Sequence, residues 1–135
     1  MGFPVVNGMR GIEFGNPGES REYLTNLILD GNKRATAGLY ELEYQSEGEP
    51  VEHVGEKLAI LDSNGKHVGT IQVTKAEVMR IADVPDEFAL AEAEGDKNAK
   101  EFRDGHLAWW RKNGFDVSEE TLVVTVYFDL IEDLR

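Results

Sequence analysis

The segment Gly31-Asn32-Lys33-Arg34-Ala35-Thr36 places an amine, a guanidinium group and a hydroxyl group within four successive residues. A threonine hydroxyl is a weak nucleophile unless a nearby base takes its proton as it attacks. Lys33 can act as that base only in its neutral form, which burial or a neighbouring cation such as Arg34 favours. The spacing predicts either a nucleophilic site, with Lys33 as base and Thr36 as nucleophile, or a pocket in which both only bind a ligand. The plainer interpretation is that Lys33 and Arg34 complement a helix C-terminus.

The elements that must position this segment are a helix before it and a strand after it. Apolar residues recur at helical spacing after Pro17-Gly18, which predicts a helix over residues 18–30 that ends at Gly31. Alternating apolar and polar residues then predict a strand over residues 34–44. The basic segment therefore lies at a corner between a helix and a strand, where a rigid scaffold presents side chains to a ligand.

Further strands and helices are expected downstream. We expect strands over residues 58–61, 68–81 (bent near Lys75) and 121–130, with Asn64-Gly65 as a tight hairpin turn that takes positive φ at both positions. A short helix follows Pro85, and apolar spacing predicts the longest helix over residues 97–112. About five or six mostly antiparallel strands with flanking helices indicate an α+β fold with a curved or barrel-like sheet, in a single domain over residues 1–135.

Composition narrows the classes of partner. The net charge of −12 opposes long-range attraction to duplex DNA and favours a nucleoside, a nucleotide or another small ligand. Most of the glutamates between Glu41 and Glu56 are expected on solvated faces. No apolar run approaches the length of a membrane span, no signal peptide is evident, and cysteine is absent, so we expect a cytoplasmic protein without disulfides.

Aromatic and histidine side chains supply the remaining candidate residues. His106 lies on the apolar side of the long helix, where a packed histidine is the plainer interpretation. Trp109 and Trp110 belong to the core and its rim, and one of them could stack on a base. Tyr44 could reach the edge of a cleft. Three scattered histidines without cysteine do not form a zinc-binding pattern, so no metal and no cofactor are expected.

The order of these motifs resembles the ASCH domain family across nearly the whole chain. The resemblance rests on five elements in sequence: Phe14-Gly15, Gly31-Asn32-Lys33-Arg34-Ala35-Thr36, Val54-Gly55-Glu56, Ala93-Glu94-Gly95-Asp96, and the helix that carries His106 and Trp109-Trp110. It implies a PUA-like β-barrel with helices beside it and a cleft where the Lys-x-x-Thr element meets the acidic segment. Members of the family are thought to act on RNA or modified nucleosides.

One branch of that family removes the acetyl group from cytidine acetylated on its exocyclic amine. The resemblance implies Lys33 as base, Thr36 as nucleophile and Glu94 as the residue that relays the proton, with Glu92 as a rival for the last role. Arg34, Tyr44, His106 and Trp110 are the expected substrate-binding residues. That branch is shorter and lacks the Trp-rich helix, so the pocket and the activity need not transfer together.

Three functions therefore remain open from the sequence. The first is an amidohydrolase acting on a modified nucleoside. The second is a non-catalytic module that binds single-stranded RNA or a nucleotide. The third is a single-strand ribonuclease in which Lys33 and His106 act on a phosphodiester, which requires these two side chains to lie within one nucleotide of each other. The sequence leaves the oligomeric state open.

Overall fold

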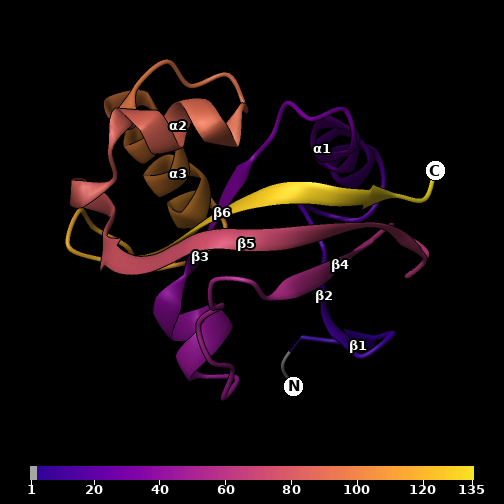
Figure 1. Ribbon diagram of the computed structural model, residues 1–135. Helices are drawn as coiled ribbons and strands as arrows, with labels where there is room; N and C mark the ends of the chain where they lie inside the picture. The colour runs from indigo at the N-terminus through magenta and orange to yellow at the C-terminus, as the bar shows by residue number, and fades with distance from the viewer. Residues whose placement is uncertain (1–2) are drawn as a thin grey trace.

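A six-stranded sheet crosses the molecule, with α2 and α3 packed near one end of its long strands and α1 near the other (Figure 1). The computed structural model describes residues 3–135. The strands are β1 (Val5–Val6), β2 (Met9–Ile12), β3 (Ala35–Leu39), β4 (Lys57–Leu61), β5 (His67–Arg80) and β6 (Leu122–Asp133). The helices are α1 (Glu19–Leu29), α2 (Asp86–Glu92) and α3 (Ala99–Lys112), with a π-helical turn η1 (Tyr40–Gln45) and a 3₁₀ turn η2 (Ile81–Asp83).

The strands lie in the order β1-β2-β4-β5-β6-β3, and every neighbouring pair is antiparallel except β2 with β4. The expected mixed α+β architecture with mostly antiparallel strands is therefore confirmed. Closure into a barrel is not confirmed, because no ladder joins β1 to β3 among residues 3–135. The register of β5 against β6 shifts between Val73 and Lys75, where the sequence predicted a bend.

The first helix and the corner after it form as predicted. α1 ends at Leu29, and Gly31 adopts a φ of 82°, a left-handed conformation that glycine takes without steric cost. The backbone N–H groups of Asn32 and Lys33 both donate to the carbonyl of Leu27, at 2.9 and 3.0 Å. These bonds satisfy the end of the helix and turn the chain directly into β3.

The strand predicted over residues 34–44 is wrong in its second half. β3 stops at Leu39, and Tyr40–Gln45 wind into η1 instead. The carboxylate of Glu43 reaches back and accepts a hydrogen bond from the backbone N–H of Leu39. It packs against Gly38, where a Cβ would lie only 2.7 Å from a Glu43 carboxylate oxygen. The local side-chain-to-backbone bond therefore overrides the alternating pattern that favoured a longer strand.

Two Asn-Gly pairs form turns in the sheet, and only one has the expected geometry. Asn7 and Gly8 both have positive φ, 52° and 78°, and join β1 to β2 with Val6 paired to Met9. This is the two-residue hairpin turn that sequence analysis assigned to Asn64-Gly65. The predicted β4–β5 hairpin is present, but Asn64 keeps a negative φ, and the loop closes by the hydrogen bond from Asp62 N to Lys66 O.

Two hydrophobic cores lie on opposite faces of β6. One, beneath α2 and α3, includes Phe88, Phe102 and Val123, and the other includes Ile28 and Val126. β6 is buried on both faces at residues 123–126, so its alternation is between two cores rather than between core and solvent. None of the helices in residues 3–135 is long and apolar enough to cross a membrane.

Candidate functional site

The side chain of Lys33 lies almost wholly inside the protein, with 1% of its surface exposed. Its Nζ donates to the carbonyl of Ala35 at 2.8 Å, to Oε2 of Glu94 at 2.7 Å and to the carbonyl of Glu92 at 3.3 Å. Three acceptors match the three donors of an ammonium group. The burial of this lysine is therefore matched by a complete set of hydrogen bonds.

The two acidic residues that the sequence left as rivals, Glu92 and Glu94, both face Lys33. α2 ends at Glu92, Ala93 takes a left-handed φ of 58°, and Gly95 follows with a φ of 100°. This sharp reversal brings Oε2 of Glu92 to 4.0 Å and Oε2 of Glu94 to 2.7 Å from Nζ. Glu94 makes the direct contact with the lysine, while Glu92 lies behind it and is 2% exposed.

His106 approaches the same carboxylate from α3. Its Nδ1 lies 2.9 Å from the carbonyl oxygen of Phe102, which can only accept a hydrogen bond, so Nδ1 carries the proton. Nε2 faces Oε1 of Glu92 at 3.5 Å. Burial raises the pKa of Glu92 to about 8; Lys33 opposes this rise and the charges of Glu94 and Asp96 add to it. The buried carboxyl group of Glu92 thus faces Nε2 of His106, the ring nitrogen that is not bonded to Phe102.

Glu92, Asp96 and His106 also have the geometry of a candidate metal-binding group. One potential ligand atom from each lies within 4.8 Å of the others. Burial raises the pKa of Asp96 as well, and His106 opposes that rise. Sequence spacing gave no sign of this set, because its members come from α2, the following loop and α3. The three groups could hold a divalent cation, although Glu92 would have to lose its proton first.

These residues open onto a cavity of about 610 Å³ between the sheet, η1 and α3. Thr36 of β3 lines it, and its hydroxyl makes no hydrogen bond with any other described residue. The cavity brings together most of the residues singled out from the sequence: Lys33, Thr36, Tyr44, Glu92, Glu94, His106, Trp109 and Trp110. Residues from both ends of the chain therefore converge on one space.

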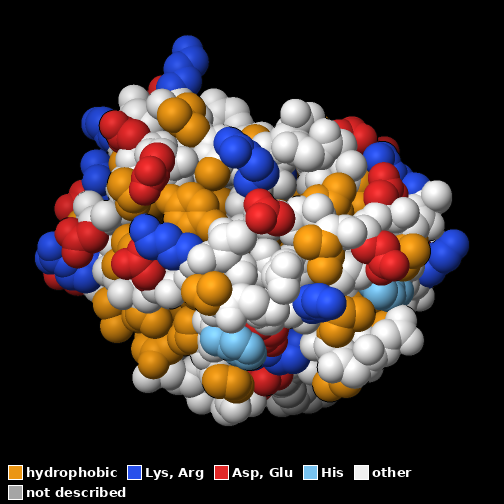
Figure 2. All heavy atoms as spheres, in the orientation of Figure 1, with side chains coloured by type: hydrophobic (Ala, Val, Ile, Leu, Met, Phe, Trp, Pro, Cys, Tyr) orange, Lys and Arg blue, Asp and Glu red, His pale blue; other side chains and the backbone are white. Residues whose placement is uncertain are grey.

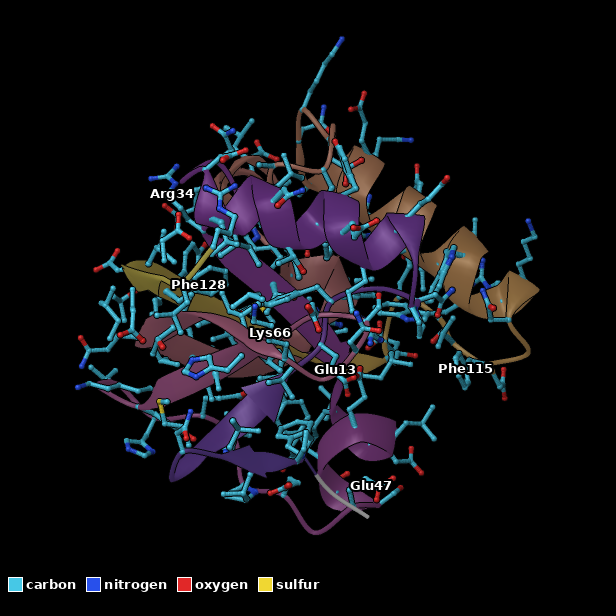
Figure 3. The ribbon with its side chains drawn as sticks, turned by 90° about the vertical axis from the view of Figure 1, so that its right-hand side faces the viewer. Glu13, Arg34, Glu47, Lys66, Phe115 and Phe128 are labelled. Carbon is cyan, nitrogen blue, oxygen red and sulfur yellow. The ribbon has the colours of Figure 1, made fainter. Side chains whose placement is uncertain are left out.

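Arg34 is the one expected binding residue that does not line the cavity. It is exposed, and Figure 3 shows it at the periphery of the molecule, beside the C-terminal end of α1. Its backbone N–H donates to Ala91 O at 2.8 Å, and its carbonyl accepts from Phe128 N at 3.0 Å. The turn that directs Lys33 inward thus directs Arg34 outward, so Arg34 is not placed to act on Lys33 or on a ligand in this cavity.

The cavity contains a second acidic group, Glu43 and Glu52, which was not predicted from the sequence. These residues were expected on solvated faces, but Glu52 is 5% exposed and both line the cavity. Burial raises the pKa of each; for Glu43 its bond to Leu39 N opposes the rise, and for Glu52 its backbone hydrogen bond does. The hydroxyl of Tyr44 donates to Oε2 of Glu52 at 3.1 Å. No signal in the sequence identifies this pair, because their place at the cavity depends on η1, a π-helical turn of the kind that often marks a functional position.

The fold and site define a small α+β domain with a polar cavity between an open sheet and its helices. The model of the ASCH domain matches residues 10–132, and the chain belongs to this family. No curated protein matches it significantly.

Two solved structures resemble the chain. The ASCH domain of Lactobacillus crispatus JV V101 is 26% identical, with a TM-score of 0.74 over 90% of this chain and 79% of the other. A protein of Enterococcus faecalis V583 is 23% identical, with a TM-score of 0.77 over 92% of this chain and 77% of the other, which shows a common fold.

Proposed function

We propose that the protein hydrolyses an amide on a modified nucleoside of the acetylated-cytidine type. The single observation that carries this proposal is the convergence of Lys33, Thr36 and Glu94 in one cavity, with Nζ of Lys33 hydrogen-bonded to Glu94. The resemblance to ASCH proteins that act on modified nucleosides supplies the substrate class. The unengaged hydroxyl of Thr36 supplies a nucleophile that need not break a bond before it attacks.

In the proposed reaction, Lys33 first passes a proton to Glu94, whose Oε2 lies 2.7 Å from Nζ. Neutral Lys33 then accepts the hydroxyl proton of Thr36 as its oxygen attacks the acyl carbon. The C–N bond breaks, and protonated Glu94 gives its proton to the departing amine. This leaves an acyl ester on Thr36, an ammonium on Lys33 and a carboxylate on Glu94.

The second half-reaction reverses these roles. Glu94 takes a proton from water, the resulting hydroxide attacks the ester, and Lys33 returns a proton to the oxygen of Thr36. The products are the free amine and the carboxylic acid, and the step leaves Lys33 neutral and Glu94 protonated, ready for the next attack by Thr36. Glu92 and His106 act as positioning residues in this scheme. Glu92 lies beside Lys33 and His106 beside Glu92, and among residues 3–135 neither is hydrogen-bonded to Thr36.

The test is release of cytidine from N4-acetylcytidine, followed by chromatography. We expect Thr36→Val, which keeps the shape and removes the hydroxyl, to lower kcat by about 10³-fold or more. Thr36→Ser should retain activity, and Thr74→Val, at an exposed position on β5, should match the wild type. An inactive wild-type protein, or an active Thr36→Val variant, would refute the mechanism.

The positions of Lys33 and His106 favour a second candidate, cleavage of single-stranded RNA. Both side chains approach the carboxyl group of Glu92, Lys33 Nζ at 4.0 Å from Oε2 and His106 Nε2 at 3.5 Å from Oε1, so an amine and an imidazole share one acidic group. Cleavage of a short single-stranded RNA that is lost in both Lys33→Ala and His106→Ala, but kept in Thr36→Val, would establish this activity. The six carboxyl side chains that line the cavity argue against it, because they repel a phosphodiester.

A further inference from the structure

Glu43 and Glu52 form an acidic wall on the part of the cavity formed by η1 and the loop after it. The bond from Leu39 N fixes one oxygen of Glu43, and the hydroxyl of Tyr44 satisfies one oxygen of Glu52. The other oxygen of Glu52, Oε1, is buried and has no hydrogen-bond partner among residues 3–135. A buried carboxyl oxygen without a hydrogen-bond partner costs free energy, so a donor placed at this oxygen would stabilise the site.

No lysine or arginine among residues 3–135 donates to this oxygen. The nearest candidate, Arg10, makes two bonds of 2.7 Å to Glu56 and another of 2.7 Å to the carbonyl of Pro50. Within the described residues, Lys33 is the only lysine or arginine that lines the cavity, and it is bound to Glu94. Six carboxyl side chains line the cavity together with this one lysine: Glu13, Glu43, Glu52, Glu92, Glu94 and Asp96. The cavity therefore attracts hydrogen-bond donors and disfavours phosphate.

The acidic wall lies at a definite distance from the proposed nucleophile. Glu43 packs directly against Gly38, where any larger residue would collide with its carboxylate. Gly38 follows Thr36 by two residues in β3, and a strand rises about 3.3 Å per residue, so the two positions are about 7 Å apart. That separation is comparable to the span of a pyrimidine ring with its exocyclic substituent.

We propose that Glu43 and Glu52 form a recognition subsite for the sugar hydroxyl groups of an unphosphorylated nucleoside. Carboxylates recognise ribose in this way, by accepting a hydrogen bond from its 2′-hydroxyl. The assignment of the acyl group to the Thr36 end rests on the proposed function. The subsite itself rests on the buried, unpartnered oxygen of Glu52, the commitment of Arg10 elsewhere and the excess of carboxyl groups in the cavity.

The experiment measures binding without turnover, by titration calorimetry on the Thr36→Val variant. The probes are cytidine and cytidine 5′-monophosphate. We expect cytidine to bind and the monophosphate to bind at least tenfold more weakly. In the same background, Glu43→Gln and Glu52→Gln should each weaken cytidine binding by about tenfold or more. The matched control is Glu41→Gln, an exposed residue of the same turn, which should leave binding unchanged.

Equal or tighter binding of the monophosphate would overturn the subsite, as would cytidine binding that is insensitive to both substitutions. If either glutamine variant fails to fold, Tyr44→Phe removes only the hydroxyl that orients Glu52 and should still weaken binding severalfold. Failure of the two proposals is distinguishable. Binding that depends on Glu52, without hydrolysis by the wild type, supports the subsite and refutes the amidase; hydrolysis with insensitive binding does the reverse.

Discussion

Glu92 is the residue whose environment departs furthest from that of its type in water. Its carboxyl is buried, lies 4.0 Å from Lys33 and faces His106, and burial raises its pKa from 4.5 to about 8. In the unfolded chain the same group ionises near its ordinary value. Between these two pH values the folded state therefore holds a proton that the unfolded state has lost, and the free energy of unfolding falls as the pH rises.

This linkage gives a prediction for Glu92→Gln, which keeps the shape of the side chain and cannot ionise. Below about pH 4.5 the wild type and the variant should differ little in their dependence on pH. From pH 5 to pH 8 the variant should gain melting temperature relative to the wild type, because glutamine has no proton for the unfolded chain to release. Thermal unfolding followed across this range checks the expectation, with the exposed Glu87→Gln on α2 as control. Parallel curves for all three proteins would contradict it.

Residue types and spacing alone singled out Lys33 and Thr36, which both line the cavity. Lys33 and Thr36 could be predicted because Gly31 ends a helix beside them, and local backbone chemistry decides that corner. Glu43 and Glu52 could not be predicted, because nothing in an acidic loop says which carboxylates will face inward. Their positions at the cavity depend on η1 and, for Glu43, on the close approach to Gly38, which only tertiary structure sets.

At the scale of elements, the helices and the strands β4 and β5 were predicted closely, whereas the end of β3 was not. Apolar spacing located α1 and α3 to within two residues at each end. β3 was overextended, because Glu43 competes for the backbone of Leu39 and no alternating pattern can reveal that. Successive residues of β6 do alternate between two faces, but each face packs against a hydrophobic core. The sequence of a central strand does not show what covers each of its faces.

Two glycines test how tightly the elements pack. A Cβ at Gly69 of β5 would lie 2.6 Å from Cδ2 of Leu29 at the end of α1 and 3.0 Å from the carbonyl of Glu132. We expect Gly69→Ala to lower the free energy of unfolding by about 1–3 kcal/mol, as overpacking does. Gly105 in α3 has open space around its Cβ position, so Gly105→Ala should raise stability by about 0.5–1 kcal/mol. Urea denaturation of both variants checks the opposite signs; two changes of the same sign would contradict this account.

For the whole molecule, the net charge of −12 and the acidic lining of the cavity both repel anionic ligands. The charged side chains on the face shown in Figure 2 are interspersed, and the basic ones do not gather into a continuous stripe that could follow a polynucleotide backbone. That the partner is a small ligand rather than a polyanion stays a prediction from composition. Composition could not locate the one buried lysine inside the acidic field, because that arrangement joins the corner after α1 to the reversal after α2.

The burial of Lys33 has a practical consequence for anyone who attaches a dye or a surface to this protein. Within residues 3–135 the other lysines, Lys57, Lys66, Lys75, Lys97, Lys100 and Lys112, are all exposed, whereas the amine of Lys33 is enclosed and fully hydrogen-bonded. Amine-reactive esters at limiting concentration will therefore conjugate the outer lysines and spare the cavity. Fluorophores or biotin can be introduced through the native sequence, without engineering a cysteine, while the interior chemistry stays intact.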